Sequence, residues 1–305
     1  MNIIDIAEKY DYEIFGDNKL EVNNISYAKE AEEDSIAIAY SKKDILNTKA
    51  KVVVTEPKFV NTDKTLILVH DSIETALVKI ANLMIEKGYY KDYFKPVELE
   101  LNNQNYVVGK NLSIGENTSI GPFSVIEDDV VIGKECIIES NATIKSGTII
   151  GDNVHIGSGS IIGSNSFYHY YESCLKSFVG IGRVIIGNNV NIGYNVIIQR
   201  GTISNTQIGD NTQIGNSIDI GHDTKIGDNC KVVSQTGIAG NVVIGHNVQI
   251  FGQVGVINNV TIGNGVTIKG KSLITKNIQD GKIISGIYAR EHKDELRIQA
   301  KLHKL

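Results

Sequence analysis

The sequence predicts a mainly β fold: a left-handed parallel β-helix of hexapeptide repeats, with a small N-terminal α/β domain and a C-terminal helix. The first observation is an aliphatic residue at every sixth position over residues 108–162, 186–198 and 208–274, with a four-residue offset before the last tract. The second is a small or β-branched residue four positions after each aliphatic, as at Thr118 and Cys136. The third is a glycine after the aliphatic, commonly followed by Asn or Asp, as in IGDNT and IGDNC.

A six-residue unit of this kind corresponds to one short strand and one corner. The aliphatic and the small residue both face inward and fill the core without voids. Gly and Asn tolerate the dihedral angles of the corner. Three units close one triangular coil, and each coil buries its faces on its neighbours, as in other solenoids. A β-sandwich would instead show two-residue alternation between turns, which is absent. Cys136 and Cys230 fall in the small inward position and are expected to be core residues.

The segments outside the repeat predict other elements. Residues 1–98 contain a helical pattern at the N-terminus, the strand-like KVVVTEP and KTLILVH, and an amphipathic helix in SIETALVKIANLMIEKG. We therefore expect an α/β domain at 1–98, the β-helix at 99–285 and a helix at 286–305. Residues 163–185 form an aromatic-rich insertion in the β-helix, and such loops commonly serve binding.

Composition excludes several classes of protein. The 305 residues carry a formal net charge of −5 and no long basic stripe, which argues against a nucleic-acid binder. The three Cys are far apart, so neither a disulfide framework nor a zinc site is expected. The acidic N-terminus does not resemble a signal peptide, and no stretch is apolar enough for a membrane span. We expect a cytoplasmic protein without a metal or a bound cofactor.

Several motifs lie outside the repeat consensus. They are FGD at 15–17, G-S-x-x-F at 163–167, GRVIIG at 182–187, I-x-R-G at 198–201, N-x-x-x-I-x-H ending at His222, QTGIAG at 235–240, VIG at 243–245, GQVGVIN at 252–258, SG-x-x-A at 285–289 and a QA-x-L helix. With these motifs the chain resembles the UDP-3-O-acylglucosamine N-acyltransferases of lipid A synthesis over nearly its whole length. The repeats alone indicate only the superfamily, and the combination is more specific.

The resemblance implies an activity and its partners. The donor is an acyl group carried as a thioester on acyl carrier protein, and the acceptor is a UDP-linked glucosamine that is already 3-O-acylated. The enzyme is a homotrimer, its N-terminal domain binds the nucleotide sugar, and His222 is the general base. The matching motifs also make Asn216 and Phe167 candidate substrate-binding residues.

The chemistry of amide formation suits these positions. The attacking amine must lose a proton, which histidine can accept near neutral pH. His222 follows an inward aliphatic at a corner, so its ring is expected to point out of the coil, toward a groove between subunits of the trimer. Backbone N–H groups of a Gly-rich turn can stabilise the oxyanion, and Gly240, one coil further on, is a candidate. Asp219 is either a residue that orients the imidazole or an exposed turn acid. The basic tail around Arg290 and Lys301 either docks an acidic carrier protein or is a solvated helix face.

The chain departs from the family pattern at three sites. The family stacks uracil on an aromatic where this sequence has Ile38, and a tyrosine six positions later is Asp44 here; Tyr40 is a candidate substitute ring. A second family histidine is Asn259, either a substrate-binding residue or an ordinary turn asparagine. The 163–185 loop continues as Tyr-His-Tyr-Tyr after Phe167, so His169 is a candidate substrate contact.

These departures leave two hypotheses open. The first is the lipid A N-acyltransferase. The second is a short-chain N-acyltransferase that uses acetyl-coenzyme A and another nucleotide-linked amino sugar of surface glycan synthesis. A non-catalytic solenoid, such as an ice-binding protein, would need flat threonine arrays, whereas the outward positions here are mixed and polar.

Overall fold

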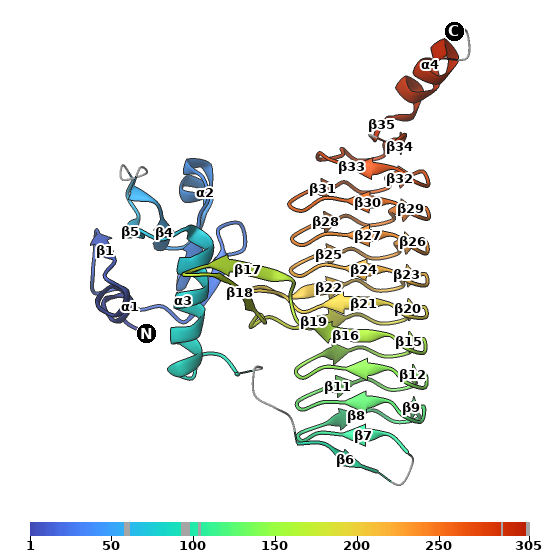
Figure 1. Ribbon diagram of the computed structural model, residues 1–305, viewed down its shortest axis with the longest axis horizontal. Helices are drawn as coiled ribbons and strands as arrows, with labels where there is room; N and C mark the ends of the chain where they lie inside the picture. Colours follow the sequence, from blue (N-terminus) through green and yellow to red (C-terminus); the bar gives the residue numbers. More distant parts are fainter. Residues whose placement is uncertain (58–61, 93–97, 103–104, 288, 303–305) are drawn as a thin grey trace. The chain divides into compact units, whose positions relative to one another are not determined.

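The computed structural model describes residues 1–57, 62–92, 98–102, 105–287 and 289–302 (Figure 1). The chain forms two compact units. The N-terminal unit contains Met1–Phe94 and Tyr168–Ile181, and the solenoid unit contains Lys95–Phe167 and Gly182–Leu305. No helix in these described residues has both the length and the apolar character needed to cross a lipid bilayer.

The N-terminal unit is built on a five-stranded sheet in the order β1-β5-β4-β3-β2. Its elements are α1 (Ile3–Tyr10), β1 (Glu13–Phe15), β2 (Asn24–Tyr27), β3 (Ser35–Ile38), α2 (Lys42–Asn47), β4 (Val52–Thr55), β5 (Thr65–Leu68) and α3 (Ile73–Glu86). Strands β2 to β5 are parallel and β1 is antiparallel to β5. The helix predicted at the N-terminus, the two strands and the long amphipathic helix are confirmed as α1, β4, β5 and α3. The sequence did not predict β1, β2 or α2.

A hairpin from the middle of the chain also belongs to the N-terminal unit. Strands β17 (Tyr168–Tyr171) and β18 (Leu175–Phe178) pair antiparallel, and β17 contacts α3. The Thr75 hydroxyl of α3 donates a hydrogen bond to the carbonyl of Tyr171, at 2.9 Å. Most of the aromatic-rich insertion therefore folds as part of this unit.

The solenoid unit has three mainly parallel sheets, which confirms the predicted β-helix (Figure 1). The first contains β6 (Glu100–Leu101), β7 (Val107–Val108), β10 (Val125–Ile126), β13 (Thr143–Ile144), β16 (Ile161–Ser164), β21 (Ile197–Gln199), β24 (Asp219–Ile220), β27 (Gly237–Ile238), β30 (Gly255–Val256) and β33 (Leu273–Ile274). The second contains β8 (Ser113–Ile114), β11 (Val131–Ile132), β14 (Ile149–Ile150), β19 (Val184–Ile186), β22 (Thr206–Ile208), β25 (Lys225–Ile226), β28 (Val243–Ile244) and β31 (Thr261–Ile262). The third contains β9 (Ser119–Ile120), β12 (Ile137–Ile138), β15 (His155–Ile156), β20 (Asn191–Ile192), β23 (Gln213–Ile214), β26 (Lys231–Val232), β29 (Gln249–Ile250), β32 (Thr267–Ile268), β34 (Ile283–Ser285) and β35 (Arg290–Glu291).

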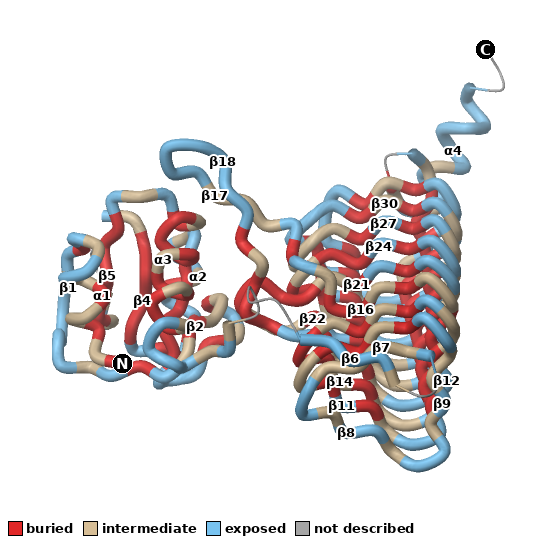
Figure 2. Tube along the Cα trace, turned by 60° about the horizontal axis from the view of Figure 1, so that its bottom comes forward, coloured by how far each residue is buried: buried red, intermediate tan, exposed pale blue. Residues whose placement is uncertain are grey.

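The core of the solenoid is the aliphatic series found in the sequence. From Ile126 onward each of its members is buried, and the buried positions follow the inside of every coil (Figure 2). Cys136 and Cys230 are buried in the small inward position, as predicted. Burial raises the pKa of both thiols, which keeps them protonated and unreactive.

The corners explain why Asn, Asp and Gly recur. One residue in each hexapeptide has a left-handed backbone, with φ between about 53° and 63° at its non-glycine examples, such as Asn153, Asn195, Asp223 and Asn259. Asn, Asp and Gly adopt this conformation at the lowest cost. The six-residue period therefore fixes the corners as well as the core.

Apart from the coil that carries the 163–185 insertion, one coil is longer than the others. Val125 pairs with Thr143 and Gly237 pairs with Gly255, whereas Ile197 pairs with Asp219, four residues further along the chain than the repeat requires. The extra residues lie between β21 and β22. They account for the four-residue offset of the repeat in the sequence.

The chain ends in helix α4 (His292–Leu302), none of whose residues is buried. Within it, Arg297 pairs with Asp294 at 2.9 Å, and Arg290 just before it pairs with Glu295 at 3.0 Å. Part of the basic tail is therefore neutralised locally. Lys304, also counted in that tail, lies outside the described residues.

Candidate functional site

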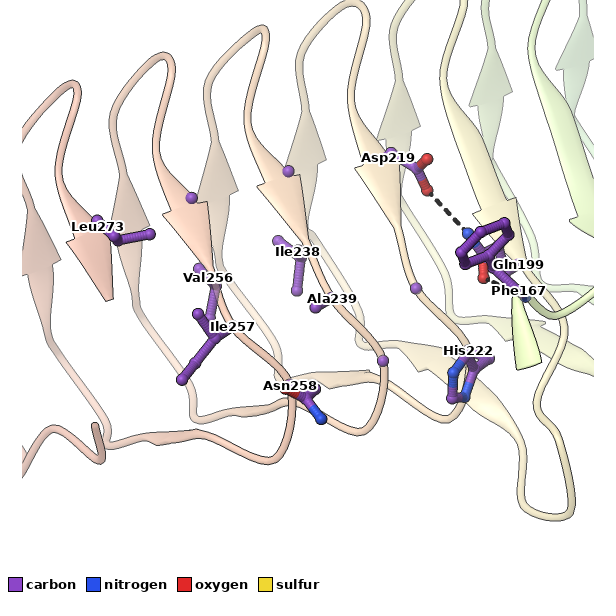
Figure 3. Close-up of a pocket in the computed structure, with 14 residues that line it drawn as sticks. Phe167, Gln199, Asp219, His222, Ile238, Ala239, Val256, Ile257, Asn258 and Leu273 are labelled. Carbon is purple, nitrogen blue, oxygen red and sulfur yellow. Dashed lines mark hydrogen bonds between the residues drawn. The ribbon is translucent and has the colours of Figure 1, made fainter. Parts of the chain in front are cut away.

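An open groove of about 530 Å³ lies along the first sheet of the solenoid, beside the corner that leads to the second sheet (Figure 3). This volume is within the range of small-molecule sites. The groove is lined by Phe167, Gln199, Asp219, Gly221, His222, Gly237, Ile238, Ala239, Gly240, Gly255, Val256, Ile257, Asn258 and Leu273. All of these residues belong to the solenoid unit.

Two glycines form the floor of the groove. Asp219, Gly237, Gly255 and Leu273 occupy equivalent outward positions on successive strands and pair in register. A side chain on Gly237 would meet no atom within 4 Å, so the space above it is open. With strands about 4.8 Å apart, the column from Asp219 to Leu273 spans about 14 Å. The result is a trough with a carboxylate at one end and an aliphatic side chain at the other.

His222 lies at the corner beside this trough and is held by a buried carboxylate. Its Nδ1 is 2.7 Å from Asp223 Oδ2 and 3.0 Å from the hydroxyl of Thr202. The His222 side chain is 16% exposed and that of Asp223 is 0% exposed. An Nδ1–H that donates to Asp223 leaves Nε2 as the basic nitrogen. The His222 ring, which was predicted to point out of the coil, is therefore largely buried and faces along the corner.

The lack of a side chain at Gly240 leaves room for the imidazole of His222. A Cβ at residue 240 would lie 2.5 Å from His222 Nε2 and 2.6 Å from Cε1, which is too close for any side chain. The edge of the ring that carries Nε2 therefore lies over the backbone of Gly240. This puts the predicted base and the predicted oxyanion donor next to each other.

The backbone amide of Gly240 is available because a ladder of hydrogen bonds is interrupted at this corner. At the corner after the second sheet, the N–H of Asp228 donates to His246 Nδ1 at 3.0 Å, and the N–H of His246 donates to Asn264 Oδ1 at 2.8 Å. At the corner after the first sheet the matching residues are His222, Gly240 and Asn258. Within the described part of the chain no acceptor is in hydrogen-bond range of the Gly240 N–H. That amide can therefore donate to a ligand in the groove.

Asp219 and Phe167 line the groove, but Asp219 is not the residue that orients the imidazole. Its carboxylate accepts a hydrogen bond from Gln199 Nε2 at 3.3 Å, and Asp223 holds His222 instead. Partial removal from water raises the pKa of Asp219, and the Gln199 hydrogen bond opposes the rise. Phe167 is 77% exposed, and its N–H donates to Gln199 Oε1 at 3.0 Å.

Asn216 is not part of this groove. It lies at the corner between the third and first sheets, one corner before His222. Its side-chain oxygen accepts from the N–H of Tyr194 at 3.0 Å, and its N–H donates to Ser234 Oγ at 3.0 Å. Six residues advance the solenoid by a whole face, so Asn216 and His222 lie at different corners of one chain, and the contact of Asn216 with a substrate stays a prediction.

Asn259 lies near the groove as a turn residue. Its φ is 62°, and its Oδ1 accepts from Asn241 Nδ2 at 2.5 Å. The adjacent Asn258 lines the groove, and sequence reasoning missed it. The contact of Asn259 with a substrate stays a prediction.

The N-terminal unit corrects one further expectation. Ile38 is 1% exposed in β3, which is buried along its whole length between β2 and β4. It cannot contact a base, because a central parallel strand is covered on both faces. Tyr40 follows the end of β3 and is 47% exposed, so it remains accessible as a candidate ring. His169 lies in β17, and its role stays a prediction.

Comparisons with known proteins agree with this architecture. The family model of the bacterial transferase hexapeptide (six repeats) matches residues 111–146 and 205–240. Two stretches of the solenoid therefore match the hexapeptide repeats of bacterial transferases. No match was found among curated proteins.

Similar solved structures come from acyltransferases. The UDP-N-acetylglucosamine acyltransferase of Bacteroides fragilis is 29% identical, with a TM-score of 0.56, over 66% of this chain and 78% of that one. The UDP-N-acetylglucosamine O-acyltransferase of Moraxella catarrhalis is 27% identical, with a TM-score of 0.55, over 63% and 75% of the two chains. The Francisella novicida UDP-N-acetylglucosamine acyltransferase is 25% identical, with a TM-score of 0.53, over 63% and 73%. Together with the matched hexapeptide repeats, these similarities support an acyltransferase.

Proposed function

We propose that the chain transfers an acyl group from a thioester to the amine of a nucleotide-linked amino sugar, with His222 as the general base. The observation that carries this proposal is the His222–Asp223 pair beside the glycine-floored groove. The groove offers space for a linear chain, and the pair offers a basic nitrogen at its side. The solved neighbours named above act on UDP-N-acetylglucosamine, which favours a UDP-sugar as acceptor.

The groups present can perform each step of this transfer. The sugar amine attacks the thioester carbonyl carbon, and His222 Nε2 takes the proton that the nitrogen loses as the C–N bond forms. The carbonyl oxygen becomes an oxyanion, which accepts a hydrogen bond from the Gly240 N–H. When the C–S bond breaks, the imidazolium returns the proton to the departing thiolate. Asp223 stabilises the imidazolium while it exists.

Two versions of the proposal differ in donor and acceptor. The first, which we favour, uses acyl carrier protein and UDP-3-O-(3-hydroxyacyl)glucosamine, in keeping with the motifs outside the repeat. The second uses acetyl-coenzyme A and another nucleotide-linked amino sugar, and the departures from the family pattern at Asp44, Asn259 and the loop after Phe167 favour it. In both, the N-terminal unit binds the nucleotide, with Tyr40 as the candidate stacking residue.

Gly237→Leu should obstruct the groove without disturbing the fold, because its side chain would enter open space. One methylene group too many in an apolar pocket costs a ligand on the order of 1–3 kcal/mol. We therefore expect KM for a long-chain acyl donor to rise at least about ten-fold. Steady-state kinetics with acyl carrier protein loaded with chains of different length measure this.

Gln249→Leu is the matched control for that variant, because Gln249 occupies the same outward strand position on the third sheet. Its kinetics should equal those of the wild type. A loss confined to long-chain donors places the acyl chain over Gly237, and a loss with acetyl-coenzyme A as well places the pantetheine arm there. Unchanged kinetics with every donor would show that the groove does not hold the donor.

We also propose that the enzyme is a homotrimer, as the resemblance implies. The solenoid has three flat faces, and a cyclic trimer would generate three equivalent sites. Light scattering should give a solution mass of three subunits. A stable monomer with full activity would contradict this assembly.

One experiment tests the function as a whole. Acyl carrier protein thioesters and acetyl-coenzyme A are each offered with a panel of UDP- and dTDP-linked amino sugars, and product masses are measured. The first version predicts a mass increase of one hydroxyacyl group on the UDP-sugar, and the second predicts acetylation. Absence of any acylated sugar nucleotide across the panel would contradict the proposed function.

A further inference from the structure

We propose that the four residues that interrupt the repeat form an anion nest for the Asp223 carboxylate, and that Thr202 is a positioning residue which acts through this nest on His222. The nest is residues 201–204, between β21 and β22. This inference rests on the proposed function, because it assigns these residues a role in aligning the base. It assigns a function to the four extra residues of this coil.

The nest surrounds the carboxylate with backbone donors. The N–H of Thr202 donates to Asp223 Oδ2 at 3.0 Å. The N–H groups of Ile203 and Ser204 donate to Oδ1 at 3.3 Å and 2.9 Å. The remaining position on Oδ2 is occupied by His222 Nδ1 at 2.7 Å. A carboxylate has about four lone-pair sites, so all of them are used.

A fully buried charge needs this arrangement. The Asp223 side chain has no exposed surface, and a buried carboxylate without partners would be strongly unfavourable. Successive backbone N–H groups form concavities that bind anions, and three of them serve Asp223. Because the amides are fixed by the backbone, they hold the carboxylate in one orientation. That orientation presents one oxygen to His222 Nδ1.

The insertion turns tightly back on itself. A Cβ on Gly201 would lie 1.7 Å from the carbonyl oxygen of Ser204 and 3.0 Å from Asp223 Oδ1. Glycine is therefore required at residue 201 for the chain to turn back on itself. A standard hexapeptide corner has no residues with which to make this turn, so the extra length of the coil is what allows the nest to form.

Thr202 contacts both members of the pair. Its N–H holds the carboxylate, and its hydroxyl lies 3.0 Å from His222 Nδ1. The residue is fully buried, so the hydroxyl has little freedom. Two oxygen atoms from different residues therefore fix the same ring nitrogen. The tautomer with Nδ1 protonated and Nε2 basic follows from this geometry.

The direct test removes the resident anion. Asp223→Gly suits the φ of 59° at this position and leaves a vacant site of carboxylate size. We expect kcat to fall on the order of 10³-fold, as for loss of the carboxylate that orients a catalytic histidine. Sodium formate should restore part of the turnover in a saturable way. Propionate, which is too large, and sodium chloride at equal ionic strength should not.

A spectroscopic readout does not depend on turnover. ¹⁵N NMR of labelled histidine reports which ring nitrogen carries the proton, and the His222 signal is assigned by its absence in His222→Ala. The wild type should show protonated Nδ1 and basic Nε2. Asp223→Gly should show a mixture, and formate should return the spectrum toward that of the wild type.

Thr202 is tested by variants that keep its shape or its hydroxyl. Thr202→Val keeps the branched shape and should lower kcat several-fold with little change in KM, and Thr202→Ser should recover most of the loss. Thr212→Val is the matched control, because its buried hydroxyl bonds to backbone groups away from His222. It donates to the carbonyl of Gly227 at 2.9 Å and accepts from the N–H of Cys230 at 3.1 Å. It should retain wild-type kcat.

Three outcomes are distinguishable. A folded Asp223→Gly with wild-type kcat, or with no response to formate in turnover or in the NMR spectrum, would overturn the nest. Equal kcat in Thr202→Val and Thr212→Val would overturn the positioning role of Thr202. Wild-type turnover in His222→Ala would instead overturn the proposed base, whatever the nest variants show.

Discussion

His222→Ala lowers kcat by a factor on the order of 10² to 10⁴, the range expected when a general base is removed. The amine must then lose its proton to water, which is less basic than imidazole and is not positioned. The ring lies at a corner of the coil and is not part of the aliphatic core. We therefore expect the melting temperature and solution mass to be nearly those of the wild type. Steady-state kinetics on the acceptor identified by product mass measure the change in kcat.

His246→Ala is the matched control for that variant. His246 is also a corner histidine, but its side chain is 57% exposed and its Nδ1 accepts the N–H of Asp228 at another corner. Its kcat should be unchanged. If the two alanine variants retained equal turnover, His222 would not be the base.

Gly240→Ala should lower kcat nearly as much as His222→Ala does, although it adds only one methyl group. The new Cβ would lie 2.5 Å from His222 Nε2, so the imidazole must move by a large fraction of an ångström or more. A displacement of about 1 Å at a catalytic group can cost on the order of 10²-fold. We expect a loss of kcat of that size, with KM affected less. Kinetics and a crystal structure of the variant would show the loss and the displaced ring together.

Gly270→Ala controls for the general effect of removing a glycine from this solenoid. Its nearest neighbour would be the carbonyl oxygen of Gly252 at 3.2 Å, which requires only a small adjustment. It should keep wild-type kcat. Full activity in Gly240→Ala would mean that the imidazole position seen here is not the reactive one.

The six-residue period predicted the architecture of the solenoid because core and corner repeat together. An inward aliphatic such as Ile220 and a small partner such as Thr224 can be identified without a structure. The glycines of the groove floor could also have been recognised from the sequence, but sequence reasoning missed them. The residue before each inward aliphatic is glycine only at Gly237 and Gly255, on neighbouring coils.

The site itself was only partly predictable. Asp223 occupies the left-handed corner position, where Asn and Asp occur in most coils, so nothing in the sequence marks it as the partner of His222. Its role depends on amides of the nest, which no side-chain pattern reveals. Asn216 is close to His222 in sequence but one corner away in space. Ile38 was placed at the nucleotide through the family resemblance, but the strand that holds it is buried along its whole length.

A crystal structure with the acylated sugar nucleotide bound tests the central claim most directly. The new amide nitrogen should lie within about 2.6–3.2 Å of His222 Nε2, or be linked to it by one water molecule. Its carbonyl oxygen should face the N–H of Gly240, and the acyl chain should follow the trough over Gly237 and Gly255. A product bound on another face of the solenoid, away from His222, would contradict the account.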